Sequence, residues 1–279
     1  MVAYRSCCGG LAALGMELVC LPDERAMRGV ILAGGSGSRL DPLTRTTNKH
    51  LLPVYDRPMI YHAIEQFVGA GIDDIMIVTG GPHAKEFRRV LEDGSHFGLK
   101  HLEYAYQERA GGIAEALGLA QPFARGSAIA LLLADNIFEY SCRDMIDRFA
   151  LRPTGACVIL AEVDDPRAYG VAQIRDGRIV RIVEKPDQPP SKFVVTGLYL
   201  YDSRAFEMAK ALRPSNRGEL EITDVNNRYL ELGELRHELV DGYWADCGES
   251  VDMLVRANNL VARHGINKMP TAHDKKHQI

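Results

Sequence analysis

The sequence has no apolar run of the 18 or more residues that a membrane-spanning helix requires. It has no basic block longer than two residues, and its 33 Lys and Arg face 37 Asp and Glu for a formal net charge of -4, which argues against a nucleic-acid-binding surface. Six cysteines are scattered without a CxxC pair, which favours reduced thiols over a disulfide framework. We therefore expect a cytoplasmic globular protein whose partners include neither a nucleic acid nor a membrane.

No linker rich in proline, glycine or serine divides the chain. Residues 1–26 precede a second methionine, Met27, and they fit a secretory signal poorly because Glu17 interrupts the apolar region and no small-x-small site follows. We expect this segment to be disordered or to be an extension from an early start site. Strand and helix patterns are continuous from 27 to 265, which predicts one domain, and residues 266–279 are expected to form a polar tail.

Short apolar runs alternate with helix-patterned segments after Met27. The runs at 28–34, 73–80 and 128–135 indicate buried strands, and segment 58–71 has apolar residues along one helical face. Such alternation predicts an α/β fold with a Rossmann-like, mostly parallel sheet that is flanked by helices on both faces. Ligands bind such sheets at the carboxyl ends of the strands.

The second half of the chain carries antiparallel signals. Asp176 and Gly177 separate two β-patterned runs, which is a strong hairpin signal, and 193–202 has the pattern of a further strand. Segments 218–233 and 250–265 are patterned as amphipathic helices. The sequence therefore predicts an antiparallel portion inserted into the α/β domain.

A glycine-rich loop follows the first predicted strand in GVILAGGSGSRLDPLT. The third glycine of a dinucleotide fingerprint falls on Leu40, which disfavours a nicotinamide-dependent oxidoreductase, and Gly35 stands where a P-loop needs lysine. The small residues of the loop nevertheless expose backbone N–H groups, and Arg39 adds a forked cation. This combination suits a polyphosphate, although a plain turn after a strand would have a similar sequence.

Further motifs follow the loop in a fixed order. They are NKHLLPVYDRPMIYHAIEQFVGAGI, YQERAGGIAEAL, LLADNIF, YGVAQI, IVEKP, TGLYLYD, RGELEITDVN and WADCG. From about Met27 to Gly265, the series resembles the sugar-1-phosphate nucleotidyltransferases, and among them the short-form glucose-1-phosphate thymidylyltransferases. The resemblance implies transfer of a nucleotidyl group from dTTP to glucose 1-phosphate by direct in-line attack at the α-phosphorus, with Mg²⁺ as cofactor and pyrophosphate as second product. The antiparallel portion would then bind the sugar.

Two aspartates are the metal candidates. The implied reaction brings two polyanions together, so it needs cations and a metal ion, and Mg²⁺ prefers carboxylate oxygens and substrate phosphates. Asp135 ends an apolar strand and would deliver a carboxylate to the ligand-binding edge, although a helix-capping aspartate would occupy the same position. The resemblance assigns both Asp135 and Asp246 to the metal.

The resemblance also assigns the other site residues. Arg39, Lys49 and Asp135 would be the catalytic residues. The nucleotide would be bound by Leu32, Ala33, Gly34, Gly35, Ser36, Gly37, Ser38, Gln107, Gly112 and Asn136. The sugar phosphate would be bound by Gly170, Glu184, Lys185, Val195 and Trp244.

Several features leave alternatives open. Ala134, Cys247 and Ser38 replace a usual glycine and two usual threonines, and QERAGGIAEAL lacks the family's proline-containing form of the base-binding segment. Thymine and uracil differ by one methyl group, which supports a discrimination of only roughly 10- to 200-fold. UTP, another hexose 1-phosphate, or a non-catalytic nucleotide-sugar sensor therefore remain alternatives.

The resemblance has two further implications, for assembly and for regulation. It implies a homo-oligomer, specifically a tetramer. The chain ends soon after Arg263, without the longer C-terminal portion that forms part of an effector site in many members. Feedback control by a nucleotide sugar therefore stays open.

Overall fold

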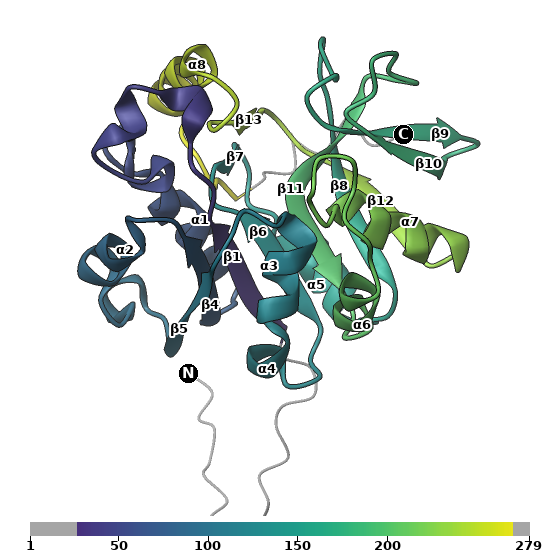
Figure 1. Cartoon of the computed structure of the whole chain (residues 1–279), viewed down its shortest axis with the longest axis horizontal. Coiled ribbons are helices and arrows are strands. Elements are labelled where there is room, and N and C mark those ends of the chain that lie inside the picture. Colours follow the sequence, from purple (N-terminus) through teal and green to yellow (C-terminus); the bar gives the residue numbers. More distant parts are fainter. Residues whose placement is uncertain (1–26, 270–279) are drawn as a thin grey trace, which may run out of the picture.

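A parallel sheet forms the first half of the fold in the computed structural model, which describes residues 27–269. β1 lies between β4 and β6, and β5 pairs with the outer edge of β4, all in parallel (Figure 1). The bounds of these strands are β1 (Arg28–Ala33), β4 (Asp74–Gly80), β5 (His101–Gln107) and β6 (Ile129–Leu133). The expected extension at 1–26 and the tail from 270 to 279 lie outside the described residues.

Helices cover both faces of this sheet because its strands are apolar on both sides. Val30 and Leu32 pack into one buried cluster, whereas Ile31 and Ala33 pack into another on the opposite face. The first cluster is completed by α3 (Ile113–Leu119), α4 (Gln121–Ala124), α6 (Ala205–Lys210) and α7 (Ile222–Glu231). The second is completed by α1 (Met59–Gly69), α2 (Ala84–Leu91) and α5 (Arg143–Ala150). The predicted α/β class is confirmed.

Antiparallel strands extend the sheet on the β6 side. β11 pairs antiparallel with β6, β8 and β9, while β9 and β10 form a hairpin. Asp176 and Gly177 turn this hairpin with φ of 50° and 70°, as the sequence predicts. The bounds are β8 (Ala156–Glu162), β9 (Gly170–Arg175), β10 (Arg178–Glu184), β11 (Phe193–Tyr201) and β12 (Leu235–Leu239), the last in parallel with β8.

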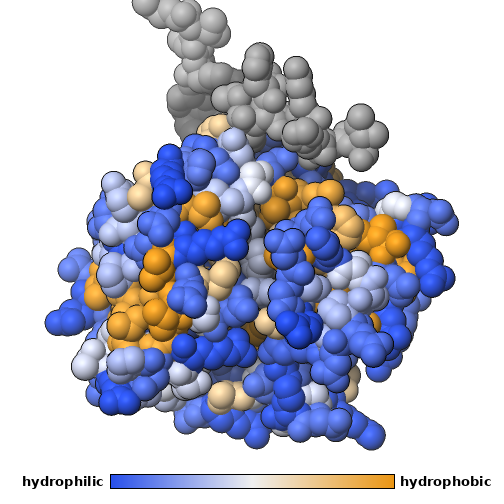
Figure 2. All heavy atoms as spheres, turned by 90° about the horizontal axis from the view of Figure 1, so that it is seen from above, coloured by the Kyte–Doolittle hydropathy of each residue, from blue (hydrophilic) through white to orange (hydrophobic). Residues whose placement is uncertain are grey.

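A small third layer lies at the carboxyl end of the parallel strands, toward the top of Figure 1. It consists of the paired strands β7 (Asn136–Phe138) and β13 (Trp244–Asp246), and α8 (Val251–His264), whose N-terminus is capped by Ser250. Short segments after β1 pack nearby: η1 (Ser38–Leu40), η2 (Leu43–Arg45), η3 (Lys49–Leu51), β2 (Pro53–Val54) and β3 (Arg57–Pro58). Figure 2 looks onto this end and shows a mostly polar surface with apolar patches on either side of its centre.

Three details differ from, or add to, the sequence pattern. The predicted helix at 218–233 begins only at Ile222, because Leu220 is hydrogen-bonded to the loop before α3 instead. Pro58 precedes α1 rather than occupying its first turn. Asn267 donates its backbone N–H to Phe138, so the residues just after 265 still contact the domain. Among residues 27–269, no helix is long and apolar enough to cross a membrane.

Candidate active site

Two adjoining cavities lie at the carboxyl end of the parallel strands. The first measures about 220 Å³, and the predicted residues that line it are Leu32, Gly34, Gly35, Lys49, Gln107, Gly112 and Asp135. The second measures about 160 Å³, and the predicted residues that line it are Arg39, Asn136, Gly170, Glu184, Lys185, Val195, Trp244 and Asp246. Ile113, Leu133 and Glu219 line both cavities. The fold therefore brings predicted nucleotide and sugar-phosphate residues into two neighbouring hollows.

Two carboxylates, the buried Asp135 and the partly buried Asp246, lie where the cavities meet. Asp135 follows β6 directly, and pairing of β7 with β13 sets Asp246 opposite Asn136, the next residue in the chain. The backbone N–H of Cys247 donates to the backbone oxygen of Asp135 at 2.8 Å, which fixes the two segments together. Two strands more than a hundred residues apart in the sequence thus pair and bring the two predicted metal ligands close together.

Lys49 pairs with Asp135 and sets the charge state of this centre. Burial by itself would raise the pKa of Asp135, but the Lys49 ammonium holds that pKa below its usual range. Burial would likewise lower the pKa of Lys49, yet the Asp135 carboxylate raises it. Burial, and then the charge of Asp135, raise the pKa of Asp246. One cation therefore faces two carboxyl groups, and Asp246 takes up a proton more readily than an isolated aspartate does.

The donor set fits Mg²⁺ in part. Among the described residues, no three His, Cys, Asp or Glu side chains are grouped as a metal site. Mg²⁺, however, commonly binds one or two carboxylates and takes its other ligands from phosphates and water. Gly248 keeps the space beside Asp135 open, since a Cβ there would clash with the carboxylate and with Lys49 Nζ. Asp135 and Asp246 are the residues that would hold a Mg²⁺ ion here.

His50 is a polar residue of the first cavity that the sequence analysis did not assign. Its Nδ1 lies 2.8 Å from Asn48 Oδ1, and its Nε2 lies 3.9 Å from Asp135 Oδ2. Burial, and then the charge of Lys49, lower the pKa of His50 to about 3. The imidazole is therefore neutral at physiological pH. It contacts Asn48 and lies near Asp135 without adding a positive charge to the site. His50 lies in the motif NKHLLP, directly after the predicted catalytic residue Lys49, and this position could have identified it.

The glycine-rich loop divides into parts with different surroundings. Gly35 lines the first cavity and has a φ of 93°, a conformation that favours glycine. Arg39 is exposed and lines the second cavity. Within residues 27–269, four predicted nucleotide residues line neither cavity: Ala33, Ser36, Gly37 and Ser38.

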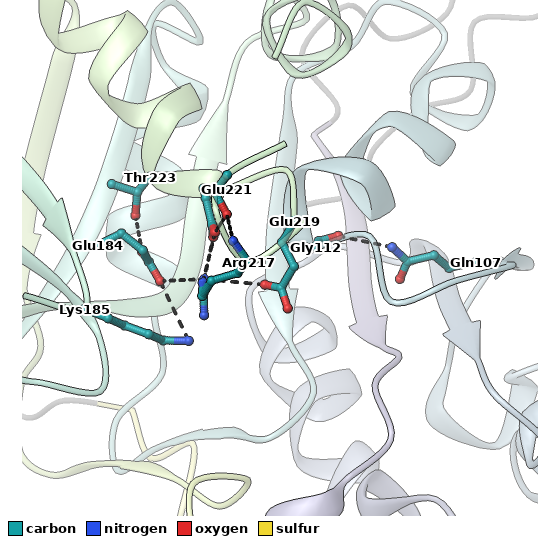
Figure 3. Close-up of polar contacts among 9 residues, drawn as sticks. Gln107, Gly112, Glu184, Lys185, Arg217, Glu219, Glu221 and Thr223 are labelled. Atoms are coloured by element: carbon teal, nitrogen blue, oxygen red, sulfur yellow. Dashed lines mark hydrogen bonds and ion pairs between the residues drawn. The ribbon is translucent and has the colours of Figure 1, made fainter. Parts of the chain in front are cut away.

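Backbone hydrogen bonds join the loop at Gly111 and Gly112, beside the first cavity, to the segment at Leu220, beside the second. Leu220 donates its N–H to the oxygen of Gly111 at 2.8 Å and accepts from the N–H of Ala114 at 3.2 Å. Gly112, between them, has a φ of 97°, and a Cβ there would clash with the backbone of Leu220. Only glycine lets the two loops approach this closely. Figure 3 shows Gly112 and Gln107 beside the polar cluster of the second cavity.

That polar cluster surrounds Glu184, at the end of β10. Glu184 Oε2 accepts from Thr223 Oγ1 at 2.6 Å, while its Oε1 lies 3.3 Å from Arg217 Nη2 and 3.9 Å from Lys185 Nζ (Figure 3). Arg217 also bonds Glu221 at 2.7 Å. The sequence analysis quoted RGELEITDVN but did not assign Arg217, Thr223 or Glu221, all of which line the second cavity.

Asn136 holds several groups around the carboxylates. Its Oδ1 accepts from the Gly197 backbone at 2.7 Å and from Trp244 Nε1 at 2.8 Å, and its Nδ2 donates to Asp135 Oδ1 at 3.1 Å. It lines the second cavity rather than the first. Its predicted contact with the nucleotide stays a prediction.

Comparison with known proteins identifies a family and relatives of this chain. The nucleotidyl transferase family matches residues 28–264. A glucose-1-phosphate thymidylyltransferase from an Actinoplanes species is 45% identical over 232 residues, covering 82% of this chain and 76% of the relative. A Bacillus anthracis crystal structure, assigned as a glucose-1-phosphate thymidylyltransferase and complexed with a sucrose, is 47% identical with a TM-score of 0.82, covering 87% of this chain and 98% of that one.

A more distant structure supports the fold alone. A UDP-glucose pyrophosphorylase complexed with UDP-glucose is 24% identical with a TM-score of 0.73, covering 85% of this chain and 99% of that one. The family resemblance that the motifs indicated is thus confirmed by both sequence and structure. This chain belongs to the nucleotidyl transferase family.

Proposed function

We propose that this chain transfers a thymidylyl group from dTTP to glucose 1-phosphate, giving dTDP-glucose and pyrophosphate. The observation that carries the proposal is the pair of adjoining cavities with the carboxylates Asp135 and Asp246 where they meet. A reaction between a triphosphate and a sugar phosphate needs two such neighbouring sites and a centre that neutralises charge between them. The names of the chain's relatives supply the two substrates.

The first cavity would take the nucleotide. Leu32 and Gly34 lie at the end of β1 and offer backbone and apolar contacts, while Gln107 and Gly112 form the polar side of the same hollow. Asp135 and Asp246 would hold a Mg²⁺ ion, which when bound supplies positive charge to the phosphates. Lys49, beside Asp135, would bind the same phosphates and stabilise charge that develops at the α-phosphorus.

The second cavity would take the sugar phosphate. Glu184 offers carboxylate oxygens to sugar hydroxyls, and it is oriented by Thr223. Lys185, Arg217 and Arg39 contribute cations to the same hollow, and these suit the phosphate of the sugar. The attacking phosphate oxygen would then face the α-phosphorus across the boundary between the cavities.

Direct attack by the sugar phosphate needs no protein nucleophile, and the cysteines agree with this. Cys142, Cys157 and Cys247 are free and buried. Burial raises the pKa of Cys157 to about 12 and raises the pKa of Cys142 and Cys247 as well. These thiols are therefore not available as thiolates at physiological pH.

Pyrophosphate release tests the proposal. The full chain is incubated with Mg²⁺, each of dTTP, UTP, dCTP and ATP, and each of several hexose 1-phosphates. The expected result is release with dTTP and glucose 1-phosphate at a kcat/KM above that of the other pairs. A higher value with UTP, or with another hexose 1-phosphate, would replace the proposed substrate. No release with any pair, despite ligand binding, would favour a sensor.

We further propose that the enzyme works in the cytoplasm as a homo-oligomer, specifically a tetramer. The free thiols of the described residues suit a reducing compartment. Light scattering coupled to gel filtration measures the assembly directly, and a monomer at micromolar concentration would contradict it.

A further inference from the structure

A carboxylate lies directly behind Gln107, one of the residues that line the first cavity. Gln107 Nε2 donates to the backbone oxygen of Gly112 at 3.1 Å and to Glu115 Oε1 at 3.2 Å. A side-chain amide nitrogen has only two N–H donors. Both donors of Gln107 are therefore used inside the protein.

The other oxygen of Glu115 pairs with an exposed arginine. Glu115 Oε2 lies 3.0 Å from both Nε and Nη2 of Arg109, on the side away from Gln107. The carboxylate packs over Gly111, where a Cβ would clash with it. The side chain of Glu115 is 20% exposed, whereas that of Arg109 is 79% exposed. Glycine at 111 thus makes room for the acidic side chain, and Arg109 covers it from solvent.

These contacts give the Gln107 amide a single orientation. A carboxylate and a backbone carbonyl are both acceptors, so reversing the amide would set Oε1 against two acceptors. In the observed orientation, Oε1 lies beside Gly34, since a Cβ at that glycine would be 3.3 Å from it. Gly34 also lines the first cavity. Figure 3 shows the amide nitrogen directed at Gly112 and the oxygen directed away from it.

We propose that Glu115 is a positioning residue that makes Gln107 a pure acceptor toward the nucleobase. The site then selects bases that present an N–H flanked by carbonyl oxygens, which is the imide edge of thymine and uracil. Cytosine presents a bare ring nitrogen at the same position, so two acceptors would face each other. The inference rests on the proposed function, because it requires a pyrimidine nucleotide in the first cavity.

The test compares kcat/KM for dTTP and for dCTP, at saturating glucose 1-phosphate and Mg²⁺. The wild-type chain is expected to prefer dTTP strongly. Glu115→Ala removes one of the two acceptors that fix the Gln107 amide, so the amide can turn and present an N–H to a base, and the dTTP:dCTP ratio should fall about tenfold, the scale of one hydrogen bond. Glu115→Gln should keep the ratio within about threefold of wild type, because its amide oxygen still accepts.

Arg109→Ala is the matched control, because the side chain of Arg109 pairs with the outer oxygen of Glu115 and not with the oxygen that Gln107 contacts. Its dTTP:dCTP ratio and the KM for glucose 1-phosphate should stay within about twofold of wild type, as expected for an exposed ion pair. If Glu115→Ala does not unfold cooperatively on heating, Glu115→Met replaces it, since methionine fills a similar volume without an acceptor for the amide.

An unchanged ratio in the folded variant that lacks the acceptor would overturn the inference, as would a wild-type chain that uses dCTP as well as dTTP. Activity with dTTP in either case would leave the proposed function standing. Failure of the wild-type chain with every nucleoside triphosphate would instead overturn the proposed function.

Discussion

Replacing Lys49 by alanine is expected to destabilise the metal-free protein and to slow turnover by orders of magnitude. Lys49 and Asp135 form an ion pair in which their side chains are 17% and 10% exposed, and Asp246 lies beside them. Alanine would leave the buried carboxyl group of Asp135 and the partly buried one of Asp246 without a facing ammonium. Removing one partner of a buried pair costs about 3–5 kcal/mol. For a domain of this size, each kcal/mol shifts Tm by about 2–4 °C, so Tm should fall by roughly 6–20 °C.

Thermal unfolding in EDTA, and then in excess Mg²⁺, measures this effect apart from activity. Mg²⁺ should restore part of the lost Tm in Lys49→Ala, because a bound cation replaces some of the missing charge. Lys100→Ala is the control: its pair with Asp73 spans 2.7 Å, but the lysine is 80% exposed, so its removal should cost less than about 1 kcal/mol.

Turnover completes the comparison for Lys49. Removal of one preorganised charge-stabilising donor lowers kcat by about 10²- to 10³-fold, and we expect a loss of this order in pyrophosphate release. Equal Tm losses for the two lysine variants, or a kcat loss under about tenfold, would refute the reasoning.

Three further substitutions test other parts of the site. Gly248→Ala should raise the Mg²⁺ concentration for half-maximal rate at least about tenfold, because the new Cβ would clash with Asp135; an unchanged Mg²⁺ titration would contradict the assignment. Arg217→Ala should raise KM for glucose 1-phosphate about tenfold or more at constant KM for dTTP, since hydrogen bonds to charged groups are worth about 1.5–3 kcal/mol; equal rises in both KM values would argue against it. Asn136→Ala should lower Tm by several degrees, because it leaves the Gly197 N–H and Trp244 Nε1 without their acceptor, at about 1–3 kcal/mol each; an unchanged melt would show that water replaces the amide.

The parallel half of the fold was predictable because each continuous apolar run in the sequence forms a buried strand there. The run before Asp135 is continuously apolar, so its strand character and the end of the strand follow from composition. The hairpin at Asp176 and Gly177 was predictable for an equally local reason, namely a turn that requires two positive φ values.

Asp246 shows where local pattern is insufficient. Its strand, β13, is three residues long and carries no periodicity, and its partner β7 follows β6 after a two-residue turn. The family motif identified the residue, but only the register of β7 with β13 explains how it comes to lie beside Asp135.

In the segment from Gly218 to Glu221, tertiary contacts override the helix pattern of the sequence. The sequence there continues the amphipathic pattern of α7, yet Leu220 is hydrogen-bonded to the loop before α3. Because of this contact, α7 begins at Ile222 and not earlier. Arg217 therefore lies outside the helix and faces Glu184. Contacts between segments about a hundred residues apart decide such a boundary, and no window of local sequence contains them.

The most direct test of the central claim is ³¹P NMR of the full chain with dTTP, glucose 1-phosphate and Mg²⁺. The two adjoining cavities predict that dTDP-glucose and pyrophosphate appear together in equal amounts, and only when all three components are present. Binding of both ligands without appearance of either product would contradict the claim.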